Sequence, residues 1–285
     1  MLSKDDIERR LTMWRTVEDA LHVFFSAHGF TQVRTPLLVR YPDLSVNLDP
    51  MQVRFDCFAP KKIPVEAALI TSPEFSMKKL LGVGMEKIYT ITSVFRGTEA
   101  LAPHNSPEFS MLEWYHPAGY EQGMQFAREL VNDVLKCQNR WPIIAHADAN
   151  VDEHGDPHID EQRFILADYP ADQAALARLS KDGKTAERFE LFADGFELAN
   201  GYCELLDGAE QKKRFAYEQW QRKQKGKPVF GIDEELVEAL DRIDGPVTGV
   251  ALGVDRLVML KYGVGDINDV QLFPAQELWS GEVME

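Results

Sequence analysis

The chain has 285 residues, of which 45% are hydrophobic and 27% charged, a composition typical of a globular protein with a sizeable core. Its formal net charge of −15 argues against a protein that coats nucleic acid, because such binding depends on clustered Lys and Arg. Three scattered cysteines without a CxxC pair, a charged first segment and the lack of a long apolar run predict a cytoplasmic protein without a zinc ribbon, signal peptide or membrane span.

The first forty residues predict a long helix and then a strand. Ser3 and Asp6 form a capping-box pattern, and apolar residues then recur at three- and four-residue steps as far as Gly29, a typical helix stop. Residues 30–39 alternate and are rich in β-forming residues, so they predict a strand. Pro36 within it indicates an edge or interface position, because proline lacks an N–H donor.

The middle of the chain predicts a hairpin between two helices. A short strand leads to a helix that starts near Pro73. A strand that ends at Arg96 is predicted to pair with a second strand over 108–117, across the loop 97–107. A helix follows, and the polar, turn-rich residues 144–162 are predicted to be a surface insertion.

The last third adds four predicted elements, which are a strand over 163–170, a hairpin over 188–206, a charged helix over 207–226 and a strand-to-helix segment over 249–263. The hairpin turns at Asp194 and Gly195. A run of antiparallel strands with helices beside it predicts an α+β fold, an antiparallel sheet flanked by helices, in a single domain over 1–285.

The loop of the first hairpin combines an arginine, a glutamate and an aromatic residue. Arg96 offers a fork of donors that suits phosphate oxygens, and Glu99 can accept from an amine. Phe109 offers a face on which a flat ring can stack. The alternative is a surface ion pair between Arg96 and Glu99, with Phe109 in the core.

A second set of residues lies at the junction GVALGVDRL. Gly249 and Gly253 let the backbone approach a ligand closely, and Arg256 falls in the first turn of the following helix. Arg256 could hold further phosphate oxygens. The alternative is a tight turn with a surface pair between Asp255 and Arg256.

A third set lies on the second hairpin, where Glu190, Glu197 and Glu204 recur at steps of seven residues. The turn resets the strand alternation, so Glu190 and Glu197 could share one face, as the carboxylates of a magnesium site do. Asn200 and Tyr202 add polar groups that are costly to bury unless they bind something. The alternative is a solvated sheet face.

Together these residues indicate adenylation by ATP. No Ser-His-Asp set, P-loop or GxGxxG motif is present, and adenylate formation needs no protein nucleophile. The substrate carboxylate attacks the α-phosphorus, while the protein supplies position and charge. Arg96 would act on the α-phosphate and Arg256 on the γ end, with Mg²⁺ between them.

The same residues carry a family resemblance. TPLL near Pro36, FRxxE with HNSPEF, and GVALGVDRL resemble motifs 1, 2 and 3 of the class II aminoacyl-tRNA synthetases, in that order. TSPEFSMKKL, PEFSMLEWY and FELANGYCELLD are similar to the lysyl branch. Residues 169–179 and LEWY resemble the lysyl-tRNA-synthetase-like ligases that modify elongation factor P and have no anticodon-binding domain.

The resemblance implies a class II catalytic domain with three groups of site residues. The implied ATP-binding residues are Arg96, Glu99, His104, Asn105, Phe109, Glu190 and Arg256, with Arg96 and Arg256 as the catalytic residues. The implied magnesium ligands are Glu190 and Glu197. The implied amino-acid pocket consists of Glu74, Tyr115, Asn200, Tyr202, Glu204 and Ala251.

The resemblance also implies a substrate, an acceptor and an assembly. Carboxylates and a phenol suit an ammonium side chain, so lysine or (R)-β-lysine is expected. Ala251 stands where lysyl-tRNA synthetases tend to have glycine, and its methyl could reshape the pocket for a β-amino acid. A lysine of elongation factor P is the expected acceptor, and Pro36 is expected at a homodimer interface.

The chain departs from the family in two places. The loop ALAPHNS lacks an arginine that the family often has after the glutamate, and the segment between Tyr115 and Arg163 is short. Both are regions that an acceptor could approach. The identity of the acceptor, with a carrier protein or tRNA as alternatives, and the choice between α- and β-lysine therefore stay open. Charging of tRNA is disfavoured by the acidic charge and by the absence of an expected anticodon-binding domain.

Two further polar segments suggest other sites, and one further function class is compatible with the fold. His146, His154 and His158 match no standard metal-site spacing and predict a surface loop. The basic run 211–227 is either a solvated face or a surface for an acidic partner. A non-catalytic domain that binds an amino acid or a partner is the alternative function, but it predicts loss of the phosphate-binding arginines or metal carboxylates, and these are present.

Overall fold

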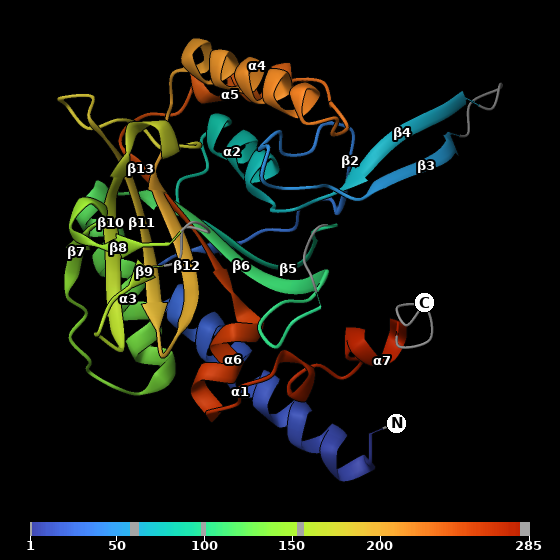
Figure 1. Ribbon diagram of the computed structural model, residues 1–285, viewed down its shortest axis with the longest axis vertical. Helices are drawn as coiled ribbons and strands as arrows, with labels where there is room; N and C mark the ends of the chain where they lie inside the picture. Colours follow the sequence, from blue (N-terminus) through green and yellow to red (C-terminus); the bar gives the residue numbers. More distant parts are fainter. Residues whose placement is uncertain (1, 58–62, 98–100, 153–156, 280–285) are drawn as a thin grey trace.

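A large central sheet organises the protein, which a computed structural model describes for residues 2–57, 63–97, 101–152 and 157–279 (Figure 1). Its eight strands follow the order β1-β5-β6-β13-β12-β11-β10-β7. Their bounds are β1 Thr31–Gln32, β5 Ile88–Phe95, β6 Glu108–Pro117, β7 Ile143–Ala145, β10 Arg163–Pro170, β11 Thr185–Ala193, β12 Phe196–Cys203 and β13 Val247–Gly253. Only the outermost pairs, β1 with β5 and β7 with β10, are parallel, so the centre of the sheet is antiparallel.

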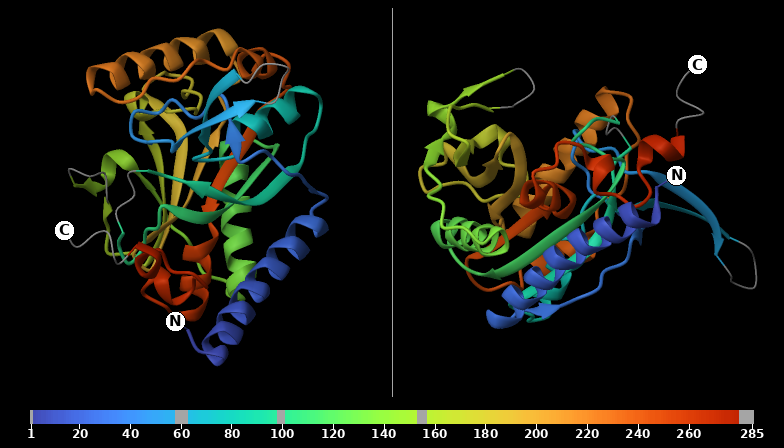
Figure 2. Two further views of the ribbon diagram at one scale, coloured as in Figure 1. Left: turned by 90° about the vertical axis from the view of Figure 1, so that its right-hand side faces the viewer. Right: turned by 90° about the horizontal axis from the view of Figure 1, so that it is seen from below.

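Three helices cover one face of this sheet. They are α1 (Lys4–Ala27), α3 (Tyr120–Leu135) and α6 (Val254–Tyr262), and Figure 2 shows α1 lying along the sheet. Buried residues of the helices, such as Leu21 and Leu130, share one hydrophobic core with Trp114 and Phe189 of the sheet. This core leaves the opposite face of the central strands free to carry polar residues.

The opposite face is bordered by a second group of helices, which Figure 1 shows together at one end of the molecule. They are α2 (Glu74–Gly82), α4 (Gly208–Gln224) and α5 (Glu234–Leu240). Phe75 of α2 and Phe215 of α4 belong to one hydrophobic cluster with residues of α5. This cluster fixes α2 and α4 as walls beside the polar face of the sheet.

The remaining elements are peripheral. A three-stranded sheet, in the order β2-β4-β3, consists of β2 (Leu38–Val39), β4 (Ile63–Leu69) and β3 (Gln52–Cys57), and in Figure 1 β3 and β4 project from the body. The others are the hairpin of β8 (Asn150–Val151) with β9 (Pro157–His158), three 3₁₀ turns (His146–Asp148, Ala171–Gln173, Ile267–Asp269) and α7 (Ala275–Trp279). Across the described ranges, no helix combines the length and apolar character needed to cross a membrane.

The structure confirms the predicted α+β class and most of the predicted elements. At the start of α1, the Ser3 hydroxyl accepts a hydrogen bond from the Asp6 N–H at 3.1 Å, and the Asp6 carboxylate accepts from Ser3, which completes the capping box. The hairpin turn takes the left-handed conformation at Asp194 and Gly195, with φ of 50° and 88°. Helices follow Pro73 and Gly253 as predicted.

Two predictions need correction or refinement. Residues 30–39 do not form one strand: only Thr31–Gln32 and Leu38–Val39 are strands, and they belong to different sheets. The chain crosses between the sheets at Pro36, which is exposed and has no N–H for a ladder. The predicted insertion 144–162 begins inside β7, which pairs with β10, and only its later part lies outside the main sheet.

Candidate active site

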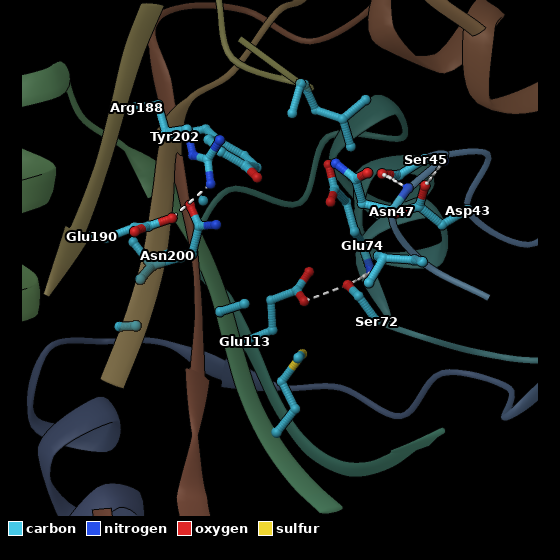
Figure 3. Close-up of a pocket in the computed structure, with 18 of the residues that line it drawn as sticks. Asp43, Ser45, Asn47, Ser72, Glu74, Glu113, Arg188, Glu190, Asn200 and Tyr202 are labelled. Atoms are coloured by element: carbon cyan, nitrogen blue, oxygen red, sulfur yellow. Dashed lines mark hydrogen bonds and ion pairs between the residues drawn. The ribbon is translucent and has the colours of Figure 1, made fainter. Parts of the chain in front are cut away.

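A cleft of about 1030 Å³ opens over the polar face of the central sheet. Its floor consists of side chains from β6, β11, β12 and β13, while α2, α4 and the segment 43–48 form a wall. Figure 3 shows Glu190, Asn200 and Tyr202 on the strands, across from Glu74 and Asp43, with Glu113 between them. Every predicted site residue within the described ranges lines this cleft.

The second hairpin brings its carboxylates to the same face, as predicted. Glu190 pairs with Asn200 in the β11–β12 ladder, whereas Phe192 pairs with Glu197, because a bulge adds a residue to β12 between these two pairs. Glu197 and Asn200 therefore both face the cleft, although they are three residues apart. The negative charge of Glu197 is one of the causes that raise the pKa of Glu190.

Glu190 is buried within a polar network. Its carboxylate accepts hydrogen bonds from the Tyr169 hydroxyl at 2.5 Å and from the Arg188 guanidinium at 2.6 Å. Arg188 also lies over the Tyr169 ring, 4.3 Å from its centroid. Burial, and then repulsion from Glu197, raise the pKa of Glu190 to about 7. The sequence analysis did not identify Arg188 and Tyr169 as site residues.

Arg256 links three segments at the edge of the cleft. It donates to the Glu197 carbonyl at 2.5 Å, to the Asn105 side-chain oxygen at 2.9 Å and to the His104 carbonyl at 3.3 Å. The first turn of α6 thus holds the β5–β6 loop against β12. The predicted residues His104, Asn105, Glu197 and Arg256 come together here.

Arg96 and Phe109 meet on the neighbouring hairpin. Arg96 directly follows β5, and its guanidinium carbon lies 5.1 Å from the centroid of the Phe109 ring. This arrangement places a cation beside the predicted stacking face. Glu99, the remaining residue of this predicted set, lies outside the described residues.

An ion-pair network occupies the inner end of the cleft. The Lys78 ammonium lies 2.5 Å from Glu74 Oε1 and 2.6 Å from Glu204 Oε2. All three side chains are buried, and burial raises the pKa of Glu204 to about 8 although Lys78 opposes the shift. Lys78 was not predicted, but its position four residues after Glu74 on one helix is a pattern that could have identified it.

Glu113 completes this network from β6. Its carboxylate accepts from the Ser72 hydroxyl at 2.6 Å and from the Tyr115 hydroxyl at 2.8 Å. Burial, and then repulsion from Glu74, raise the pKa of Glu113 to about 8. The sequence analysis identified Tyr115 but missed Glu113, whose signal was a single carboxylate within the buried run MLEWYH.

Small residues on β13 keep the cleft open. A Cβ atom at Gly249 would lie 2.2 Å from Glu204 Oε1 and 2.3 Å from a ring carbon of Tyr115, so only glycine fits there. Ala251, two residues further on, pairs with Asn200 across the sheet and with Glu113 on the other side. The predicted residues Asn200, Glu204 and Ala251 therefore lie around one pocket with Glu113.

No group of three or more potential metal ligands occurs among the described residues. The carboxylates facing the cleft at Glu190 and Glu197 are a pair. His146 packs against the ring of Tyr169, and His158 lies 3.9 Å from Asp152, while His154 is outside the described ranges. The predicted loop is therefore corrected at these two positions, since His146 lies in a 3₁₀ turn and is half-buried, while His158 belongs to β9.

Comparison with known proteins agrees with this architecture. The family model for tRNA synthetases class II (D, K and N) matches residues 1–277, so the chain belongs to this family. Among its relatives is the elongation factor P–(R)-β-lysine ligase of Yersinia enterocolitica, 35% identical over 88% of this chain and 90% of that protein. The ligase of the same name from Photorhabdus laumondii is 35% identical over 90% of this chain and 92% of its own length.

Proposed function

We propose that the protein is an ATP-dependent ligase that activates lysine or (R)-β-lysine as an adenylate and transfers it to a lysine side chain of elongation factor P. The observation that carries the proposal is the buried group of carboxylates, Glu74, Glu113 and Glu204, at the inner end of a cleft that also holds Arg96 and Arg256. Ammonium groups suit the first set and phosphates the second. The names of the relatives support the substrate and the acceptor.

The reaction has two steps. An oxygen of the substrate carboxylate attacks the α-phosphorus of ATP and forms the acyl–phosphate bond as the bond to pyrophosphate breaks. The ε-amine of the acceptor lysine then attacks the acyl carbon, loses a proton and releases AMP. The protein contributes position and charge in both steps, because neither step needs a protein nucleophile.

ATP is expected to bind along the outer part of the cleft. Arg96 is assigned to the α-phosphate and Arg256 to the γ end, and Phe109 offers a face to the adenine. His104, Asn105 and Glu99 complete the assignment. The contacts of Arg256 with the β5–β6 loop support it, since they join the elements that would enclose the nucleotide.

The carboxylate pair fits a magnesium ion bound together with ATP. Glu190 and Glu197 offer the oxygen ligands that Mg²⁺ prefers, and two side chains are enough when phosphates and water provide the rest. Each Glu190 oxygen accepts one hydrogen bond and retains a further lone pair. Mg²⁺, when bound, supplies positive charge beside the phosphate oxygens.

The amino acid is expected to bind over Glu113, Asn200, Tyr202 and Ala251. The Asn200 side-chain oxygen is buried and has no hydrogen-bond partner among the described residues, as a group that awaits a donor would be. The methyl of Ala251 narrows the pocket between Glu113 and Asn200, and we assign the choice between α- and β-lysine to this residue.

The acceptor is expected to approach along α4, which forms part of the rim of the cleft. The segment 211–227 is basic in an otherwise acidic chain, and Tyr217 and Trp220 expose stacked rings whose centroids are 5.6 Å apart. Exposed aromatic residues beside charge are typical of protein interfaces. A translation factor as the acceptor implies a cytoplasmic location.

A homodimer is part of the proposal. Pro36, Leu37 and Leu38 are consecutive and exposed, and Leu38 belongs to β2, which lies at the base of the projecting β3–β4 hairpin (Figure 1). A contiguous exposed apolar stretch of this kind favours contact with a second copy. A non-catalytic binding domain, or a ligase that acts on a carrier protein or tRNA, is the alternative function.

ATP–pyrophosphate exchange tests the proposed function. We expect exchange with (S)-α-lysine, with (R)-β-lysine or with both, and a drop of about 100-fold or more in Arg256→Ala. The better substrate decides the role assigned to Ala251. Absence of exchange with both amino acids, in protein shown to be folded, would favour the non-catalytic alternative.

A further inference from the structure

Lys78 is a buried lysine that the two-step reaction does not use. Its side chain is 3% exposed and contacts Glu74 on its own helix and Glu204, which directly follows β12. Burial of a lysine is costly unless the charge is paired, and breaking a buried pair leaves an uncompensated charge. Lys78 therefore joins the wall of the cleft to its floor through two ion pairs.

The charges around Lys78 do not balance. Glu74, Glu113 and Glu204 contribute three carboxylates, whereas in the described part of the chain the ammonium of Lys78 contacts Glu74 and Glu204. Glu113 is held by two neutral hydroxyl groups instead. With all three carboxylates ionised, the group carries two excess negative charges. Two is also the number of ammonium groups in a diamino acid such as lysine.

One oxygen of this network is buried without a partner in the described residues. Glu204 lines the cleft, and its Oε2 lies 2.6 Å from the Lys78 ammonium, although neither carboxylate oxygen has a hydrogen bond of good geometry among the residues described. Oε1 has no ion-pair partner among them either, and it packs against Gly249, where a Cβ atom would lie 2.2 Å from it. Lys78 thus holds Glu204 by one oxygen and leaves the other for a ligand.

We propose that Lys78 is a positioning residue that holds Glu74 and Glu204 in place and neutralises one of the three carboxylates, so that the pocket, once its carboxylates are ionised, matches a substrate with two ammonium groups. This inference rests on the proposed function, because it concerns the amino-acid end of the same cleft. Lys78 itself does not touch the reacting atoms; it acts through the two carboxylates.

Calorimetric measurement of lysine binding to Lys78→Met tests the inference. The variant keeps the length of the side chain and removes the charge. We expect the dissociation constant for lysine to rise roughly 100-fold at pH 7, since a buried partner is lost, with little change in ATP binding. Without Lys78, the carboxylates hold an additional proton that lysine must displace. The defect should therefore narrow as the pH rises from 7 to 8.5.

The titratable and charged groups that face this network come from four segments of the chain: Glu74 and Lys78 of α2, Glu113 and Tyr115 of β6, Tyr202 of β12 with Glu204 directly after it, and Asp43 beside α2. Burial raises the pKa of both tyrosines, so neither adds charge between pH 7 and 8.5. The predicted pH effect therefore belongs to the carboxylates.

The neighbouring Lys79 provides a matched control. It also pairs with two carboxylates, at 2.7 Å from Asp233 and 2.8 Å from Glu235, but it does not line the cleft. Lys79→Met should therefore bind lysine within about twofold of the unsubstituted protein. Lysine binding by Lys78→Met within threefold of the unsubstituted protein, or an equal loss of ATP and lysine binding, would overturn the inference.

The variant Lys78→Arg tests the effect of position separately from the effect of charge. It also serves as the test if Lys78→Met does not fold. A guanidinium keeps the charge but not the compact ammonium that both carboxylates share. We expect about tenfold weaker lysine binding without the added pH dependence. Unchanged binding would disprove the positioning role. Binding is measured without catalysis, so the two proposals can fail separately. If the unsubstituted protein binds lysine but shows no pyrophosphate exchange, only the proposed function is contradicted. If it does not bind lysine, both the proposed function and the role of Lys78 are contradicted.

Discussion

At the residue scale, the raised pKa values of Glu113 and Glu204 predict proton release when lysine binds. Both carboxyl groups have a pKa of about 8, so each is largely protonated at pH 7 in the free protein. A bound ammonium favours the ionised form and lowers these values. We expect one to two protons to be released per lysine at pH 7, and about half as many in Glu113→Gln.

Calorimetry in two buffers with different enthalpies of ionisation measures this proton release. The enthalpy of binding should differ between the buffers at pH 7, and the difference should be about half as large in Glu113→Gln. Equal enthalpies at pH 7 would show that the carboxylates are already ionised before lysine binds.

The sequence predicted those site residues that stand out from an apolar pattern. Glu190, Glu197, Asn200 and Glu204 are polar residues in or directly after a hairpin rich in Leu, Phe and Ala, and all of them line the cleft. The bulge that places Glu197 and Asn200 on one face has no signature in the sequence. The spacing of Lys78 four residues after Glu74 predicts an ion pair on one helix, but the contact with Glu204, which places this pair in the site, is tertiary and has no local signal.

At the element scale, helix α4 is predicted to serve transfer and not adenylation. Trp220 is 54% exposed and stacks on Tyr217, which lines the cleft. We expect Trp220→Ser to leave pyrophosphate exchange unchanged and to lower the rate of lysine transfer to elongation factor P about tenfold, because an exposed aromatic anchor would be lost. The mass increase of elongation factor P measures transfer.

Phe273→Ser is the control for this prediction. Phe273 is 78% exposed and precedes α7, which Figure 1 shows at the opposite end of the molecule from α4. It should leave both activities unchanged. Equal transfer rates for Trp220→Ser and the unsubstituted protein would show that Trp220 of α4 does not contribute to docking of the acceptor.

Elements with strong local signals were predictable. The capping box at Ser3 and the left-handed turn at Asp194 and Gly195 each determine the conformation of a short segment on their own. The prediction of one strand over residues 30–39 was wrong, because the alternation of apolar and polar residues does not show which strand each part pairs with. Thr31–Gln32 pairs with β5 and Leu38–Val39 with β4, and two partners in different sheets divide the segment.

At the scale of the whole molecule, the polar face of the sheet should make stability depend on pH. The antiparallel order and the α+β class followed from the alternation of the strands, but the assembly of a cleft from four strands and two helices depends on long-range pairing. This assembly buries carboxyl groups of the cleft, and burial raises the pKa of these groups. Glu113, Glu190 and Glu204 all have a pKa above the ordinary value of 4.5.

A carboxyl group with a raised pKa in the folded state stabilises the fold fully below its unfolded pKa, and this contribution is lost as the pH rises through the folded value. For Glu113 and Glu204 the loss extends to about pH 8. His116 acts in the opposite direction, since burial lowers its pKa to about 4, but its contribution is complete above pH 6.5. Between pH 6.5 and 8.5 the carboxyl groups therefore dominate.

We expect the melting temperature of the ligand-free protein to fall by about 4 °C or more between pH 6.5 and 8.5, which corresponds to a loss on the order of 2 kcal/mol. Saturating lysine should reduce this fall, because its ammonium groups neutralise the ionised carboxylates. Glu113→Gln should reduce it as well, because a neutral amide does not titrate. Thermal unfolding followed by fluorescence measures the fall in melting temperature for the ligand-free protein, for the protein with lysine and for Glu113→Gln. A melting temperature that stays level or rises across this range would mean that the buried carboxylates are compensated without a ligand, and that the excess negative charge of the pocket does not exist.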